Sequence, residues 1–202
     1  MNQDGYSVES LPLMRQLVSD IGWFSKKADP IIGLLEIDVT DARERIHAHT
    51  AATGERLSFT GFLVHCVARA VDQHKHVHAL RGWRGRLVIY DDVDIATMIE
   101  IEADGRKTPA GRVIRAANHK TLRQIHDEIR GVQVAQDKSD EAGIIRYFSR
   151  FPRFIRRPMM YILFRTPQWS KRLRGTVVVT AVGLFGKGGG WGVGLPSHPL
   201  TG

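Results

Sequence analysis

The stretch SFTGFLVHCVARAVDQ, residues 58–73, decides the fold class of this chain. Its apolar residues recur at intervals of three and four, which is typical of one face of an α-helix, and Ser58 or Thr60 can cap the first turn. A helix with such a face buries it against another layer, so we expect residues 58–73 to form a core helix. The apolar positions are Phe59, Phe62, Leu63, Cys66, Val67, Ala70 and Val71.

Working outward from this helix, both helical and strand patterns occur on either side of it. Further helices are predicted for residues 11–22, 41–50 and 120–135. Runs of β-branched residues predict strands for residues 33–39, 87–90, 93–102 and 176–182, and residues 108–116 are expected to be extended. Elements of both kinds interleave throughout, so the fold class is α/β (α+β) with a mixed sheet.

Length and composition favour a single domain over residues 1–202. Apolar residues make up 43% of the chain and charged residues 25%, as in ordinary globular proteins. The lone cysteine, Cys66, excludes an internal disulfide, and residues 1–9 lack the pattern of a secretory signal. No apolar run approaches the ~20 residues that span a bilayer. We therefore expect a cytoplasmic protein.

The positive charge is concentrated in one segment. Nine basic residues and no acidic ones lie within residues 146–174, so the remaining 20 Lys and Arg residues nearly balance the 21 acidic residues. Phenylalanines, methionines and prolines interleave with these arginines, which predicts a basic-aromatic insert of short helices broken at Pro152, Pro158 and Pro167. It could form a lid packed on the sheet, or contact an anionic membrane surface or another protein. No nucleic-acid partner is expected, since no recognition motif is present.

Six short motifs follow one another along the chain. They are LEIDVT (35–40), LSFTGFL (57–63), ARA (68–70), YDDVDI (90–95), VIRAANHKTL (113–122) and VTAVGLFG (179–186). In this order and spacing they resemble the catalytic domain of 2-oxo acid dehydrogenase acyltransferases. The resemblance covers roughly residues 11–145 and 175–195 and implies a chloramphenicol acetyltransferase-like two-layer sandwich of helices on a mixed sheet. It also implies a short stand-alone form without a lipoyl domain or bound lipoyl group.

The same resemblance implies a chemistry. An acyl group would move between coenzyme A, bound as acyl-CoA, and a thiol such as dihydrolipoamide. A histidine would remove the thiol proton, and a hydroxyl on the strand before the GLFG turn would stabilise the oxyanion; here Thr180 holds that position. The histidine belongs to an H-x-x-x-D-G motif further along, and none of the nine histidines begins one. We therefore expect a domain that is incomplete at its C-terminal end and turns over slowly.

Two further residues are assigned to substrate binding through the resemblance. Arg15 falls near the family's arginine in the first helix, although a solvated arginine fits this position equally, and His65 could line the substrate channel. The alternating His74, His76 and His78 could share one face of a strand, but a helix end and turn are expected there, so no metal site is predicted. The expected assembly is a homotrimer with active sites between subunits, able to meet 2-oxo acid dehydrogenase components. The rival hypothesis is a non-catalytic scaffold whose insert binds a membrane or protein.

Overall fold

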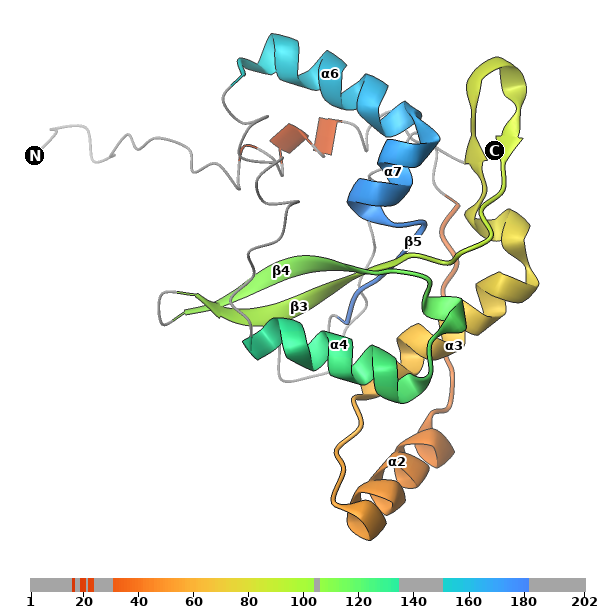
Figure 1. Cartoon of the computed structure of the whole chain (residues 1–202), viewed down its shortest axis with the longest axis vertical. Helices are drawn as coiled ribbons and strands as arrows, with labels where there is room; N and C mark the ends of the chain where they lie inside the picture. The colour runs from red at the N-terminus through yellow and green to blue at the C-terminus, as the bar shows by residue number, and fades with distance from the viewer. Residues whose placement is uncertain are drawn as a thin grey trace, which may run out of the picture.

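A three-stranded mixed sheet forms the centre of the computed structural model, which describes residues 16, 19–20, 22–23, 31–103, 106–134 and 151–181 (Figure 1). Strands β3 (Ile95–Ala103) and β4 (Arg106–Ile114) form an antiparallel hairpin, and β5 (Val177–Val179) runs parallel to β3 on its other side. A separate antiparallel pair joins β1 (Leu80–Arg81) to β2 (Leu87–Val88). The predicted mixed sheet is confirmed, with β5 shorter than the sequence predicted.

Helices α3 (Phe59–Gln73) and α4 (Leu122–Val134) build the core against this sheet. Ser58 caps α3, since its hydroxyl accepts a hydrogen bond from the Gly61 amide at 3.3 Å. Thr121 and Gln124 form a reciprocal capping box at the start of α4. The helices and strands share one apolar cluster, made of Val64, Ala68, Val71, Val93, Ile95, Ile114, Ala117, Ile125 and Ile129.

The segment of residues 31–39 is not a strand, contrary to the prediction. It is irregular and leads into α2 (Thr40–Thr53), where Asp38 accepts hydrogen bonds from the backbone amide and hydroxyl of Thr40. A strand needs a hydrogen-bonded neighbour, and no described strand pairs with this segment. Its apolar side chains are therefore exposed, and Leu35 is 82% accessible. Helix α2 itself has no buried residue.

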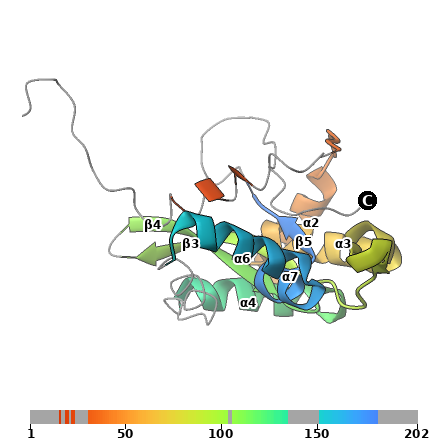
Figure 2. The same cartoon turned by 90° about the horizontal axis from the view of Figure 1, so that it is seen from above.

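The insert contains two helices, α6 (Arg153–Arg165) and α7 (Pro167–Arg174). Pro152 precedes α6 and Pro167 begins α7, as predicted, but Pro158 lies inside α6 without breaking it. The Phe154 carbonyl, which the proline ring deprives of an amide donor, lies on the exposed side of the helix, where water can satisfy it. In Figures 1 and 2, α6 and α7 lie across the strands from α4.

Short turns and the chain start complete the described structure. Three 3-10 helices, η1 (Lys75–His78), η2 (Trp83–Gly85) and η3 (Ala117–His119), connect the elements. Of the predicted first helix, Gln16, Ser19, Asp20 and Gly22 are helical, as is Trp23 just beyond it. None of the described helices is both long enough and apolar enough to cross a bilayer.

Candidate functional site

Thr180 directly follows β5 and is exposed. Val177 and Val179 pack against the core cluster, whereas Val178, between them, is 57% accessible. Because side chains alternate along an extended chain, Thr180 shares the outward face with Val178. Thr180 is therefore exposed on the side of the sheet away from the core.

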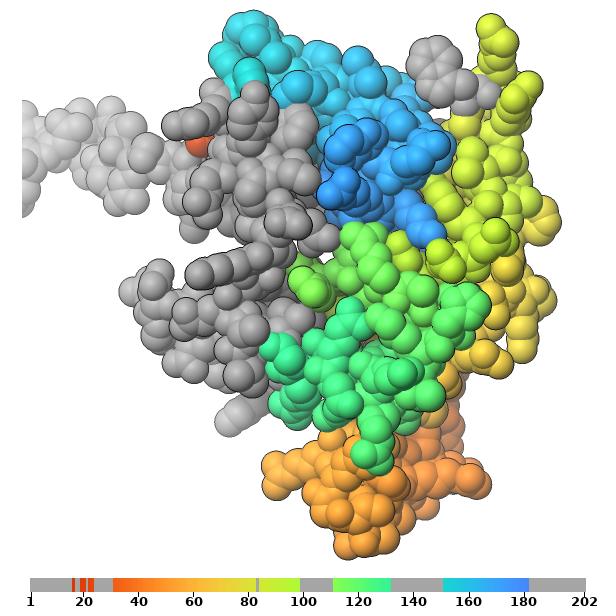
Figure 3. Space-filling model, viewed as in Figure 1, coloured from red at the N-terminus to blue at the C-terminus, as the bar shows by residue number. Residues whose placement is uncertain are grey.

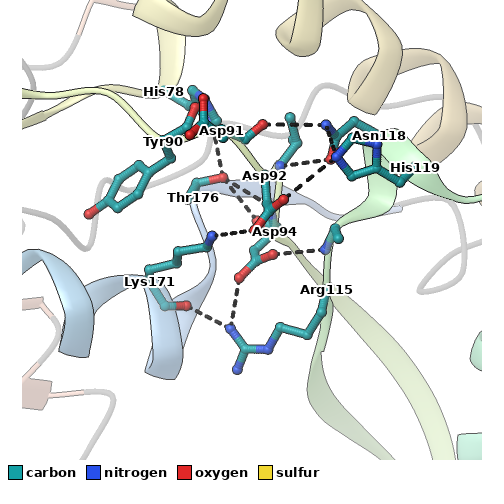
Figure 4. A network of polar contacts seen from close by, with 12 residues as sticks. His78, Tyr90, Asp91, Asp92, Asp94, Arg115, Asn118, His119, Lys171 and Thr176 are labelled. Atoms are coloured by element: carbon teal, nitrogen blue, oxygen red, sulfur yellow. Dashed lines mark hydrogen bonds and ion pairs between the residues drawn. The ribbon is translucent and has the colours of Figure 1, made fainter.

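A polar network fixes the start of β5, as Figure 4 shows. The backbone amides of Thr176 and Val177 donate hydrogen bonds to the Asp94 carbonyl at 2.7 and 3.1 Å. In return, the Thr176 hydroxyl accepts from the Asp94 amide at 3.1 Å. These reciprocal bonds join β5 to Asp94, the residue that precedes β3. They therefore set the position of the strand that Thr180 directly follows.

His78 extends this network from η1. Its Nδ1 lies 2.9 Å from the Thr176 hydroxyl and its Nε2 lies 3.2 Å from the Tyr90 carbonyl. Burial lowers the pKa of His78, and the positive charges of Lys171 and Lys75 act in the same direction. The lowered pKa favours the neutral ring, and because a carbonyl can only accept, the Nε2 tautomer would donate to Tyr90.

Arg115 links the same network to the insert. It donates to the Asp94 carboxylate at 3.1 Å, to the Lys171 carbonyl at 2.8 Å and to the Arg172 carbonyl. The two carbonyls belong to the last turn of α7, and the Lys171 carbonyl also accepts from the Gly175 amide at 3.0 Å. The second Asp94 oxygen accepts from the Ala116 amide at 2.8 Å. One guanidinium thus ties α7 to the sheet.

Gly175 joins α7 to β5 in a conformation that only glycine tolerates. Its φ is +70°, and a Cβ at this position would lie 2.5 Å from the Asp94 carbonyl oxygen. The close approach is what allows the amides of Thr176 and Val177 to reach that carbonyl. The Gly175 turn, the contacts of Asp94 and the strand β5 that precedes Thr180 therefore depend on one another.

The structure places the other predicted site residues differently. His65 is half-buried on α3, and its Nδ1 is buried without a hydrogen-bond partner in the part of the chain that is described. No hydrogen bond connects His65 with Thr180 among the described residues, so one chain does not bring them together through polar contacts. Arg15 lies outside the described residues.

The described residues show no metal cluster, and the described grooves lie away from Thr180 and His65. Across the described ranges, no group of three or more His, Cys, Asp or Glu residues could hold a metal ion. The expected helix end and turn at His74–His78 is confirmed, and His78 bonds to protein groups. Two open grooves of about 480 Å³ each flank α2, but neither Thr180 nor His65 lines them.

Sequence reasoning missed the residues that hold β5. Asp94 and Arg115 lie within two of the quoted motifs, YDDVDI and VIRAANHKTL, but no role could be derived for them there. Gly175 was detectable in principle, because glycine directly after a helix rich in basic residues is a common helix stop. His78 and Thr176 are 98 residues apart, and nothing in the sequence pattern connects them.

Comparison with known proteins identifies a family and similar folds. A family model described as 2-oxoacid dehydrogenases acyltransferase (catalytic domain) matches residues 28–140. Among solved structures, a probable dihydrolipoamide acetyltransferase from Listeria monocytogenes has a TM-score of 0.65 at 19% identity, over 96% of this chain and 71% of its own. The cubic core of the pyruvate dehydrogenase multienzyme complex has a TM-score of 0.63 at 15% identity, over 98% and 71%.

A truncated catalytic core of the 2-oxoacid dehydrogenase multienzyme complex from Thermoplasma acidophilum is also similar. Its TM-score is 0.53 at 20% identity, over 66% of this chain and 62% of its own. Among curated protein sequences, none matches the chain. At these identities, the likeness to solved structures shows the acyltransferase core fold.

Proposed function

Because the chain belongs to the 2-oxoacid dehydrogenase acyltransferase (catalytic domain) family, we propose that it transfers an acyl group between coenzyme A and a thiol acceptor. The acceptor would be dihydrolipoamide or a related thiol. The observation that carries this proposal is Thr180, an exposed hydroxyl at the end of the strand that the Asp94 network holds in place.

The role proposed for Thr180 is electrostatic. Attack of a thiolate on a thioester carbonyl develops negative charge on the carbonyl oxygen, and a fixed hydroxyl can donate a hydrogen bond to it. Such a donor accelerates the reaction only if it is already oriented when the charge forms. The bonds between Thr176 and Asp94 support this orientation, since they fix the chain four residues before Thr180.

The thiol must reach the site as a thiolate. None of the histidines in this sequence begins the H-x-x-x-D-G motif of the family's general base. We propose that His65 and Arg15 bind substrate and do not replace that base. The Nδ1 of His65, buried and without a hydrogen-bond partner among the described residues, supports a contact with a ligand. The rate should then follow the ionised fraction of the acceptor thiol.

The test is release of free thiol from acetyl-CoA in the presence of dihydrolipoamide. We expect the rate to rise between about pH 7 and 9, because a free thiol ionises near pH 8.5. Thr180→Ala should lower the rate about 10²-fold at every pH, and Thr180→Ser, which keeps a hydroxyl, should restore most of it. An equal rate in Thr180→Ala would remove Thr180 from the mechanism.

We further propose that the protein works in the cytoplasm as a homotrimer with sites between subunits, in contact with 2-oxo acid dehydrogenase components. The exposed apolar residues 31–37 support an interface with a second copy, because a single chain leaves them in water. The rival, a non-catalytic scaffold, predicts neither acetyl-CoA binding nor thiol release at any pH. Binding of coenzyme A without transfer would indicate a domain that needs further residues for catalysis.

A further inference from the structure

Helix α6 of the insert is oriented with its charged side inward. Arg156 is only 1% accessible, and its Nε donates to the Asp20 carboxylate at 2.7 Å, while Nη2 lies 2.5 Å from the same oxygen. Arg157 donates to the other Asp20 oxygen at 3.0 Å. Near the C-terminal end of α6, Phe164 is buried under the Arg174 guanidinium, which lies 3.8 Å from the ring centre. These contacts fix the rotation of the helix.

The same rotation turns an apolar face outward. Phe154 is 75% accessible and Ile162 is 66% accessible, and they lie at helical spacing on one side with Ile155 and Pro158, both exposed. A helix on a water-exposed surface normally shows the reverse arrangement, with apolar residues inward. In Figure 3 the atoms of α6, in cyan, form the outer edge of the molecule at the end opposite α2.

Exposed arginines lie on the same two helices as this face. Arg153 and Arg165 are exposed at the two ends of α6, and Arg172 and Trp169 are exposed on α7 beside it. No acidic residue occurs within residues 146–174. An exposed apolar face on a segment with exposed arginines and no acidic residues is complementary to a surface that offers hydrocarbon beneath negative headgroups.

We propose that the outer face of α6 binds an anionic membrane surface, with the helix lying in the plane of the headgroups. At 13 residues, α6 is far shorter than the ~20 residues of a spanning helix, so it would lie in the interface. A second copy of the chain fits less well, because outside the insert its acidic and basic residues nearly cancel and offer no matching negative field. The inward Asp20 contacts hold the face in place before binding.

The test is flotation of the whole protein with vesicles of phosphatidylcholine, with and without phosphatidylglycerol. We expect flotation with the anionic vesicles at 0.1 M salt and much less at 1 M, because the Debye length falls from about 10 Å to 3 Å. Phe154→Ser should weaken the partition at least tenfold, and Phe154→Ser with Ile162→Ser should abolish it. Val77→Ser, which removes an exposed apolar side chain in η1, is the matched control and should float like the wild type.

Charge reversal provides a second, independent variant. Arg153→Glu with Arg165→Glu leaves the apolar face and the Asp20 contacts in place, and it should remove the preference for phosphatidylglycerol. Absence of flotation at 0.1 M salt would overturn the proposal, as would equal flotation with neutral vesicles. If Phe154→Ser instead changed the mass of the protein in solution and left its flotation intact, the face would be a protein interface and the membrane proposal would be wrong.

Discussion

At the scale of single residues, Gly175 decides whether β5 can form where it does. Its backbone lies so close to Asp94 that a methyl group would meet the carbonyl oxygen, and its φ of +70° disfavours any other residue. The neighbouring amides depend on this approach, because they donate to that same carbonyl. Thr180 therefore relies on a glycine five residues earlier in the chain.

We expect Gly175→Ala to lower the free energy of unfolding by about 2–4 kcal/mol, because the positive-φ backbone conformation and the clash each cost about 1–2 kcal/mol. Gly54→Ala is the matched control. Its φ is +73° but the space around it is open, so only the backbone cost of about 1 kcal/mol should appear. Urea unfolding of both variants measures the difference, and equal losses would show that the Asp94 contact is not limiting.

At the scale of elements, polar contacts attach both helices of the insert to the rest of the chain. Asp20, fully buried, forms ion pairs with Arg156 and Arg157 of α6, and Arg115 holds the end of α7 against Asp94. Both attachments join segments far apart in sequence. The lid interpretation of the insert thus describes its inner side, whereas the apolar outer side of α6 is open to a partner.

Asp20→Ala should cost about 3–5 kcal/mol, because it leaves a buried arginine without its counterion. The control is Asp91→Ala, which removes an exposed carboxylate 3.4 Å from Lys75 and should cost less than about 1 kcal/mol. Hydrogen exchange should show faster exchange of the α6 amides in Asp20→Ala alone. Unchanged protection of α6 would mean that other contacts hold the helix.

At the scale of the whole molecule, a single chain leaves the apolar residues 31–37 exposed. Residues 31–37 present Ile31, Leu35 and Ile37 to solvent, next to a helix, α2, that buries nothing. Apolar stretches of this kind are typical of surfaces that are covered in an assembly. The segment has the composition of a strand, and the trimer proposed above predicts that a neighbouring subunit covers it.

We expect light scattering to give three times the chain mass of 22.7 kDa for the wild type. Leu35→Asp combined with Ile37→Asp should give the single-chain mass, because burying two carboxylates in an apolar interface costs several kcal/mol. Phe154→Ser, on the insert, should leave the trimer intact. A single-chain mass for the wild type would contradict the trimer.

The sequence by itself determined the class of fold and most of its elements. Helical periodicity located α3 and α4, and β-branched runs located β3 and β5, because these signals depend on neighbours within a few residues. Motif order pointed to the family and to Thr180. The β-branched composition of residues 33–39 also predicted a strand that one chain does not form, because composition alone cannot supply a pairing partner.

Tertiary structure alone decided what holds the candidate site and which way the insert faces. Asp94 meets Thr176 across 82 positions, and Asp20 meets Arg156 across 136, distances at which local patterns carry no information. Composition showed that the insert is basic and aromatic. Only the burial of Arg156 against Asp20 showed that Arg156 faces inward and Phe154 outward, because long-range packing fixes the rotation of a helix.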